Sequence, residues 1–163
     1  MGEDDVRGKE AAMWSNTSDV FRLTYRTRHE DAIFCPDLVM RPDDKGAFAR
    51  GRNTLLLAAR LEELRRGCAY QYYIFLDGDV EVYPGDWASS LLGFESFLQI
   101  WSPAVGVPLF FNADVPFLLT HLFKKEQHQD PEEPLSISWY DQLFVAIHRE
   151  AAQVILPLDP SWD

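Results

Sequence analysis

The pattern of hydrophobic and polar positions divides the 163-residue chain into short segments of different period. Residues 1–18 are polar and rich in turn-forming residues, so we expect a loose lead-in there and a single domain over residues 19–163. The runs 20–25 and 31–35 combine β-branched and aromatic residues with rough alternation, and Pro36 stops the second run. These runs predict two short strands near the start of the domain.

A helix with a leucine-rich face is predicted next. Residues 54–66 follow a helical period that places Leu57, Leu61 and Leu64 on one face. Gly67 directly after this run is a typical helix stop. This is the clearest helical segment in the sequence.

Strands and helices alternate along the rest of the chain. Residues 72–76 form an uninterrupted apolar run, which is typical of a strand covered on both faces, as parallel strands flanked by helices are. We further expect helices over 87–101, 112–126 and 150–155, a strand over 104–107, a polar loop over 124–134, and a strand or a helix over 137–147. This alternation predicts an α/β fold with layered elements.

An acidic cluster follows the apolar run directly, in the stretch YIFLDGDVEV, where Asp77 and Asp79 flank Gly78. Ligands of open α/β sheets bind beyond the carboxyl ends of strands, and i, i+2 spacing in an extended chain brings both carboxylates to one side. Two anions about 4 Å apart repel each other by several kcal/mol at an intermediate dielectric constant, and a hard divalent cation relieves this repulsion. The cluster therefore predicts a Mn²⁺ or Mg²⁺ site that also holds phosphate. The alternative is a solvated turn.

The charge of the chain narrows the classes of function. The 26 acidic and 15 basic residues leave a net charge of -11, which disfavours binding to nucleic acid and to anionic membrane surfaces. An acidic protein that handles an anionic substrate needs local positive charge, and a divalent metal supplies it. No stretch approaches the roughly 20 apolar residues of a membrane span. Two cysteines, Cys35 and Cys68, are too few for a disulfide framework.

The order of these segments resembles the nucleotide-binding half of GT-A fold glycosyltransferases over about residues 19–158. The resemblance is carried by VFRLTYR, by GRNTLLLAARLEE, by YYIFLDGDVEV with its D-x-D motif, and by the later runs AVGVP and ISWYDQLFVAIHREA. It implies a Rossmann-like sheet of mostly parallel strands flanked by helices. It also implies sugar transfer from a nucleotide-sugar donor to a hydroxyl group of a glycan, protein or small-molecule acceptor, with Mn²⁺ or Mg²⁺ as cofactor.

The resemblance assigns roles to four residues near the donor. Asp77 and Asp79 become the metal and diphosphate residues, with Asp79 the more direct ligand. Arg52 and Asn53 would lie near the nucleotide, where a guanidinium can offer two parallel donors to a phosphate. Helix capping and a surface ion pair are the alternative roles for these two residues.

Two residues near the C-terminus complete the implied site. Asp141 in WYDQ is the candidate for acceptor contact or general base, because the aromatic residues beside it resemble a sugar-stacking platform. Packing of those aromatic residues in the core is the alternative. His148 is the candidate further metal ligand. The family supplies its general base and last histidine ligand from beyond the REA stretch, so this sequence departs from the family pattern and resembles a truncated relative.

Two rival functions stay open. FLDGDV also fits the first motif of haloacid dehalogenase-like phosphatases, in which Asp77 would attack phosphorus and Asp79 would handle protons. Thr120, Lys124 and the pair Asp159 and Asp163 follow in the order of that family's later motifs. The third possibility is a non-catalytic subunit that keeps the GT-A fold. The sequence is compatible with the cytoplasm and, for a domain excised from a longer chain, with the Golgi lumen.

Overall fold

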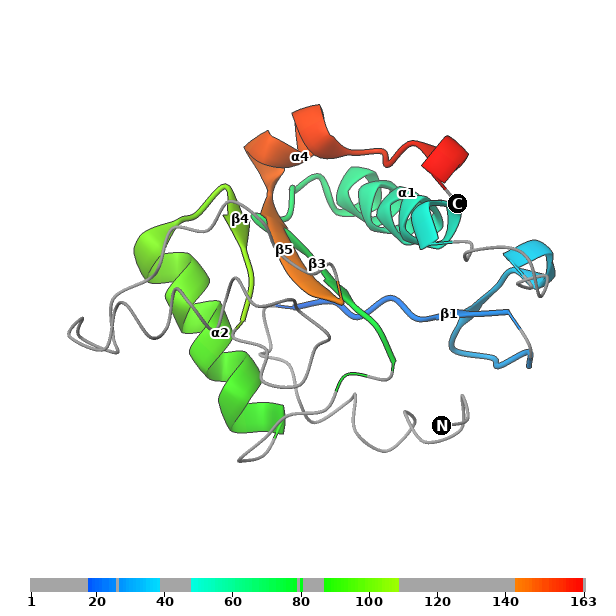
Figure 1. Cartoon of the computed structure of the whole chain (residues 1–163), viewed down its shortest axis with the longest axis horizontal. Coiled ribbons are helices and arrows are strands. Elements are labelled where there is room, and N and C mark those ends of the chain that lie inside the picture. The colour runs from blue at the N-terminus through cyan, green and yellow to red at the C-terminus, as the bar shows by residue number, and fades with distance from the viewer. Residues whose placement is uncertain are drawn as a thin grey trace.

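The computed structural model describes residues 18–25, 27–38, 48–78, 80, 87–108 and 143–162 (Figure 1). In chain order its elements are β1 (Leu23–Thr24), β2 (Ile33–Phe34), the 3₁₀ turn η2 (Pro36–Leu38), α1 (Phe48–Arg66), β3 (Tyr72–Leu76), α2 (Trp87–Trp101), β4 (Val105–Gly106), β5 (Phe144–His148), α4 (Arg149–Ile155) and η3 (Pro160–Trp162). The helix expected over 112–126 and the loop expected over 124–134 lie outside the described residues.

The described strands form two small sheets. β1 and β2 pair in parallel, whereas β5 lies between β3 and β4 and runs antiparallel to both. The expectation of mostly parallel strands therefore does not hold for the three-stranded sheet. An apolar run indicates only that both faces of a strand are covered. An antiparallel strand between two layers of helices meets this condition as well as a parallel strand does. The coarser expectation, a fold that mixes helices and strands, is confirmed and is compatible with the α/β class.

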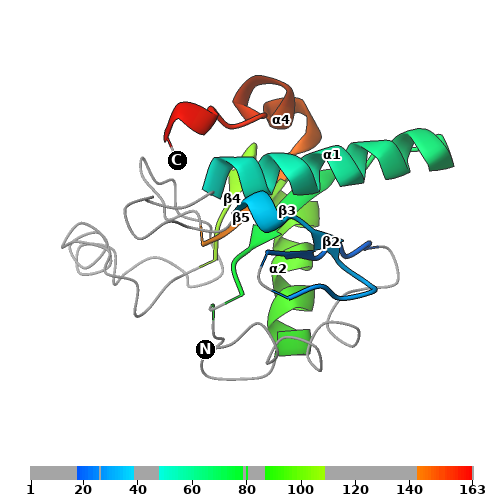
Figure 2. The same cartoon turned by 90° about the vertical axis from the view of Figure 1, so that its right-hand side faces the viewer.

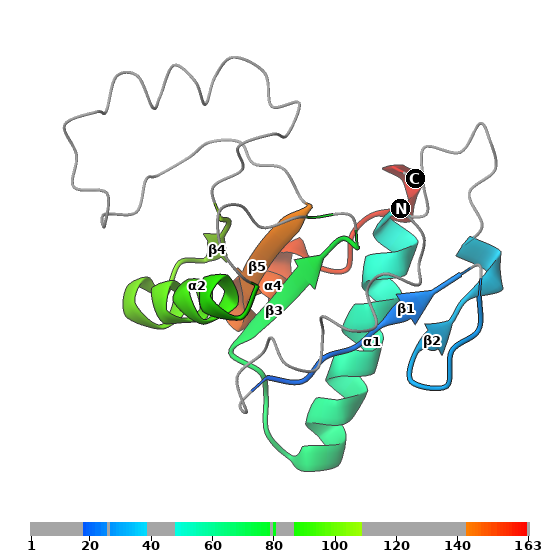
Figure 3. The ribbon, with the colours of Figure 1, turned by 90° about the horizontal axis from the view of Figure 1, so that it is seen from below.

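Helices cover both faces of the three-stranded sheet (Figures 1 and 3). On one face, Leu91 and Leu98 of α2 pack against alternate strand residues, among them Ile74 and Ala146. On the opposite face, the intervening strand residues pack against α1 and α4. They form a second cluster, which contains Leu56, Phe75, Val145, Ile147, Ala152 and Leu156. The period-2 alternation of the strands thus divides the apolar residues between two half-cores.

The buried face of α1 is not the leucine-rich face that its period suggested. Leu57, Leu61 and Leu64 are all exposed. The helix instead buries a set of residues spaced by three and four, namely Ala49, Arg52, Leu56 and Ala59. A helix with two apolar stripes has the same period on either side, so local sequence cannot select the stripe that meets the sheet.

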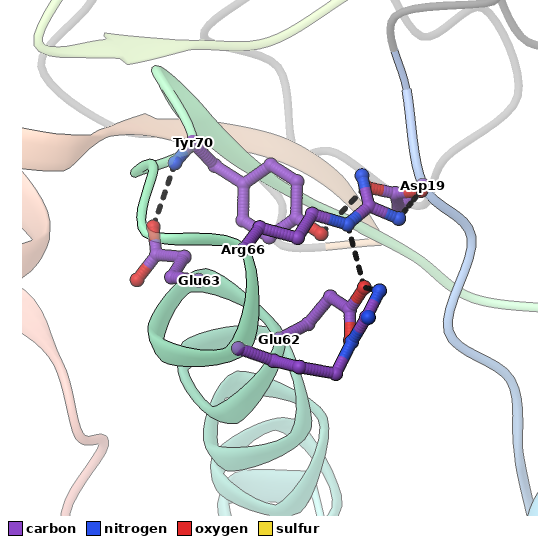
Figure 4. Close-up of polar contacts among 6 residues, drawn as sticks. Asp19, Glu62, Glu63, Arg66 and Tyr70 are labelled. Atoms are coloured by element: carbon purple, nitrogen blue, oxygen red, sulfur yellow. Dashed lines mark hydrogen bonds and ion pairs between the residues drawn. The ribbon is translucent and has the colours of Figure 1, made fainter.

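The C-terminal end of α1 is tied to neighbouring segments by a polar cluster (Figure 4). Arg66 forms two hydrogen bonds with the carboxylate of Asp19, at 2.6 and 2.8 Å, and the hydroxyl of Tyr70 donates to the same carboxylate at 2.6 Å. Glu62 accepts hydrogen bonds from Arg65 and Arg66. Burial and the Asp19 carboxylate raise the pKa of Tyr70. The cluster therefore joins the segment before β1, the end of α1 and the segment before β3.

We expect Glu62 to contribute to stability in a pH-dependent way. Hydrogen bonds from Arg65 and Arg66 lower its pKa from 4.5 to about 2. Because the folded-state value is the lower one, the contribution is present above pH 4.5 and is lost as the pH falls towards 2. The thermal midpoint difference between wild type and Glu62→Gln should therefore be larger at pH 6 than at pH 3.

The control for this prediction is Glu30→Gln, which alters an exposed glutamate in the loop between β1 and β2. Its effect should be small and similar at both pH values. Salt should reduce the Glu62 effect because the ion pairs are at the surface. A Glu62→Gln difference of the same size at pH 6 and pH 3 would contradict the prediction.

Candidate functional site

Asp77 lies directly beyond the carboxyl end of β3, where the sequence pattern predicted a ligand site. Its backbone N–H donates to the carbonyl of Leu143 at 2.9 Å, so the pairing of β3 with β5 holds the residue in place. The carbonyl of Asp77 accepts from the N–H of Val80 at 3.3 Å, and the chain turns there. The Asp77 side chain is 35% exposed. A carboxylate in this position can contact a solvent-borne ligand while remaining attached to the core of the sheet.

The buried guanidinium of Arg52 holds the side chain of Asp77. Arg52 Nη2 donates to Asp77 Oδ1 at 2.8 Å, and only 6% of the Arg52 side chain is exposed. The guanidinium carbon also lies 4.0 Å from the centre of the Phe48 ring and 5.4 Å from that of Phe75. A buried arginine needs an anionic partner, and aromatic faces add further attraction for its charge. The contact fixes the direction of the Asp77 carboxylate from a rigid helix.

The other predicted nucleotide residue of α1 contacts the C-terminal segment. Asn53 Nδ2 donates to the carbonyl of Leu158 at 2.8 Å, and the Leu158 N–H donates back to Asn53 Oδ1 at 2.8 Å. Figure 2 shows the segment that contains α4 and η3 lying along α1. Arg52 and Asn53 therefore point to different neighbours, although they are adjacent in sequence. Asn53 lies inside the helix and does not cap it. Arg52 does form an ion pair, with its own side chain buried and that of Asp77 partly exposed.

His148 lies at the opposite end of the sheet from Asp77. In the register of β3 and β5, Tyr72 pairs with His148, and Leu76, which precedes Asp77, pairs with Phe144. Because each residue advances a strand by about 3.3 Å, His148 and Asp77 lie on the order of 15 Å apart. The expectation that His148 joins Asp77 as a metal ligand is therefore corrected. Its Nδ1 instead accepts from the N–H of Glu150 at 3.4 Å and caps α4.

The remaining predicted site residues, Asp79 and Asp141, lie outside the described residues. Within the described part of the chain, no group of three or more His, Cys, Asp or Glu side chains is arranged to hold a metal ion. A metal bound at Asp77 would thus need its other ligands from elsewhere in the chain, such as Asp79, or from a substrate. The chemistry of a partly exposed carboxylate fits Mn²⁺ and Mg²⁺, which prefer oxygen ligands.

Sequence reasoning did not pair Arg52 with Asp77. A signal for it was available, since Arg52 is spaced three residues after Ala49 and four before Leu56, on one face of the helix. A lone arginine within an apolar stripe indicates a buried cation, and a buried cation requires an acid nearby. To use this signal, one has to choose the face with Ala49, Arg52 and Leu56 as the buried one. The row of leucines on the other side of the helix is the more obvious choice.

The comparisons with known proteins returned no match, either to a family model, to a curated protein or to a solved structure. Among the helices that the structure describes, none is both long and apolar enough for a transmembrane segment. The chemistry of the strand end is accordingly the basis for assigning a function.

Proposed function

We propose that this chain is a metal-dependent GT-A-like glycosyltransferase, which uses a nucleotide-sugar donor and a hydroxyl acceptor. The observation that carries the proposal is the partly exposed Asp77 carboxylate at the end of β3, fixed by the buried Arg52. The α/β layering on both faces of β3 is compatible with it. In a GT-A-like fold, ligands would bind beyond the carboxyl ends of parallel strands, and Asp77 follows the carboxyl end of β3.

Charge balance supports a divalent cation at this position. Arg52 supplies one positive charge to Asp77. Asp79, two residues further, and the diphosphate of a donor add negative charges that this single arginine does not balance. We therefore infer that Asp79 is the direct metal ligand and that Asp77, oriented by Arg52, contributes to the same site. Mn²⁺ and Mg²⁺ commonly bind through one or two carboxylates plus substrate phosphates.

The residues of the chain contribute mainly by orientation. When bound, a divalent cation would offset the negative charge that develops on the leaving nucleoside diphosphate. Arg52 holds Asp77 in one direction, so that less ordering is needed when the donor binds. Asp141 stays the proposed acceptor contact or general base. His148 is not included in this site.

The phosphatase alternative makes a different demand on Asp77. A haloacid dehalogenase-like enzyme would use a carboxylate oxygen of Asp77 to attack phosphorus. In this structure Oδ1 accepts a hydrogen bond from the buried Arg52, so the attack would come from the other carboxylate oxygen, Oδ2. In a non-catalytic subunit with the same fold, Asp77 would have only a structural role, through its contact with Arg52.

Donor binding should raise the thermal midpoint only when Mn²⁺ is present. The screen would use UDP-, GDP- and CMP-linked sugars with and without Mn²⁺, on wild type and on Asp79→Ala. At a donor concentration of about 100 times Kd, the expected stabilisation is ~2.7 kcal/mol, or about 5–10 °C for a chain of this length. Asp79→Ala should abolish this shift, because the metal loses its main ligand.

The matched control is Asp31→Asn, which alters an exposed acid paired with Arg22 far from β3 in sequence. It should keep the full donor shift. A shift that needs no metal, or that persists in Asp79→Ala, would overturn the proposed site. Phosphate release from a phosphomonoester that depends on Asp77 would support the phosphatase instead, and the absence of both activities would support the subunit.

A further inference from the structure

The guanidinium of Arg52 lies against an aromatic ring from the preceding turn of its own helix. Phe48 is the first residue of α1 and comes four residues before Arg52, a spacing that brings both side chains to one side of the helix. The Arg52 Cζ atom lies 4.0 Å from the centre of the Phe48 ring and 5.4 Å from that of Phe75 in β3. Both rings lie within the range of a cation–π contact, and the nearer one comes from α1 itself.

Burial alone does not account for Phe48. The residue is 39% exposed, whereas Arg52 is 5% exposed. At about 100° per residue, Phe48 lies at the margin of the face that buries Ala49, Arg52 and Leu56. A partly exposed ring gains less from burial than a core residue does, so the contact with the guanidinium is the interaction that distinguishes this position.

Phe48 reaches the candidate site through two successive contacts. Its ring contacts the guanidinium, and Arg52 Nη2 donates to Asp77 Oδ1 at 2.8 Å. An arginine side chain has many rotamers, and a hydrogen bond at one nitrogen does not by itself fix the plane of the guanidinium. A second contact with a ring restricts that plane further. The direction of the Asp77 carboxylate therefore depends on Phe48 as well as on Arg52.

We propose that Phe48 is a positioning residue of the donor site. Its aromatic face holds Arg52, and Arg52 holds the Asp77 carboxylate in the direction that donor binding needs. This role rests on the proposed function. It requires an aromatic face and not apolar volume alone, because leucine fills a similar space but lacks the negative charge density of the ring face. Phe48 acts through Arg52 and does not have to touch the donor.

Phe48→Leu and Phe48→Tyr test the proposal on the full chain, with Mn²⁺ and inorganic pyrophosphate as the probe for the diphosphate of a donor. Calorimetric titration should give a Kd that is about 5-fold or more higher in Phe48→Leu than in wild type. Phe48→Tyr keeps the ring, so its Kd should stay within about 2-fold of wild type. The matched control is Leu57→Ala, which alters an exposed apolar residue of the same helix and should leave the Kd unchanged.

NMR of the arginine side chains gives a second readout that needs no ligand. The two Nη signals of Arg52 should be distinct in wild type and in Phe48→Tyr, because the guanidinium is held in one orientation. They should merge in Phe48→Leu, because the guanidinium then rotates faster. Arg52→Lys identifies these signals by their disappearance.

Three results would overturn the proposal. A Kd in Phe48→Leu equal to that of wild type, even with a lower thermal midpoint, would leave Phe48 with a role in stability only. Equal losses in Phe48→Leu and Phe48→Tyr would show that the aromatic face is not what matters, and Nη signals that stay distinct in Phe48→Leu would show that the ring does not hold Arg52. If wild type does not bind pyrophosphate with Mn²⁺ while the Nη signals respond as expected, the proposed function fails, and the role of Phe48 in donor binding fails with it, whereas the contact of Phe48 with Arg52 stands.

Discussion

Arg52→Ala is expected to lower the free energy of unfolding by about 2–4 kcal/mol, measured by urea denaturation. The substitution removes the guanidinium that pairs with Asp77 and leaves space beside Phe48 and Phe75. Removing one partner of a fully buried ion pair costs about 3–5 kcal/mol, and the partial exposure of Asp77 reduces that figure. Donor binding should weaken as well, since the Asp77 carboxylate would no longer be held in one direction.

A matched variant and a double-mutant cycle separate the ion pair from a general effect on the helix. Arg50→Ala alters an exposed arginine of the same helix and should change stability by less than about 0.5 kcal/mol. Arg52→Ala combined with Asp77→Ala should cost about 1–3 kcal/mol less than the sum of the single substitutions. Additive effects would show that the two side chains are not coupled.

Leu91→Ala should reduce stability by about 2–5 kcal/mol and lower the thermal midpoint by about 5–15 °C. Leu91 is 1% exposed and belongs to the cluster between α2 and the sheet, with Phe94, Leu98 and Phe144. The loss combines the transfer free energy of the removed methyl groups with the cost of a cavity that its neighbours cannot fill completely.

The adjacent residue in α2 is the control for this variant. Leu92 is 48% exposed, so Leu92→Ala should lower the thermal midpoint by no more than about 3 °C. Circular dichroism melting curves of both variants test the orientation of the helix directly. Equal effects of the two substitutions would mean that α2 does not bury the face that contains Leu91.

Much of the local structure could be predicted because the spacing of hydrophobic residues within a segment depends only on that segment's own sequence. The strand at 72–76 and the helix at 87–101 were expected within the bounds observed, since an apolar run and a helical spacing are local properties. The start of α1 was misjudged, because Phe48 to Asn53 contain glycine and arginines rather than a periodic apolar pattern. The position of Asp77 directly after the strand was also apparent from sequence.

The candidate site could be predicted only in part. The acidic pair after the strand indicated where a ligand could bind, but not that Arg52 would contact Asp77 from a helix 25 residues earlier. His148 was selected by residue type, and the register with β3 placed it at the other end of the sheet. Asn53 was selected by motif, and its partner Leu158 lies 105 residues away.

By itself the sequence determined the strand at 72–76, the helix at 87–101 and the C-terminal part of α1, and that a carboxylate follows the strand. Only the tertiary structure decided the antiparallel direction of β5, the face of α1 that meets the sheet, and the pairing of Arg52 with Asp77. The physical reason is the distance in sequence over which each kind of interaction acts. Period and turn chemistry act between neighbours in sequence, whereas burial and charge pairing depend on which distant residues the fold brings into contact.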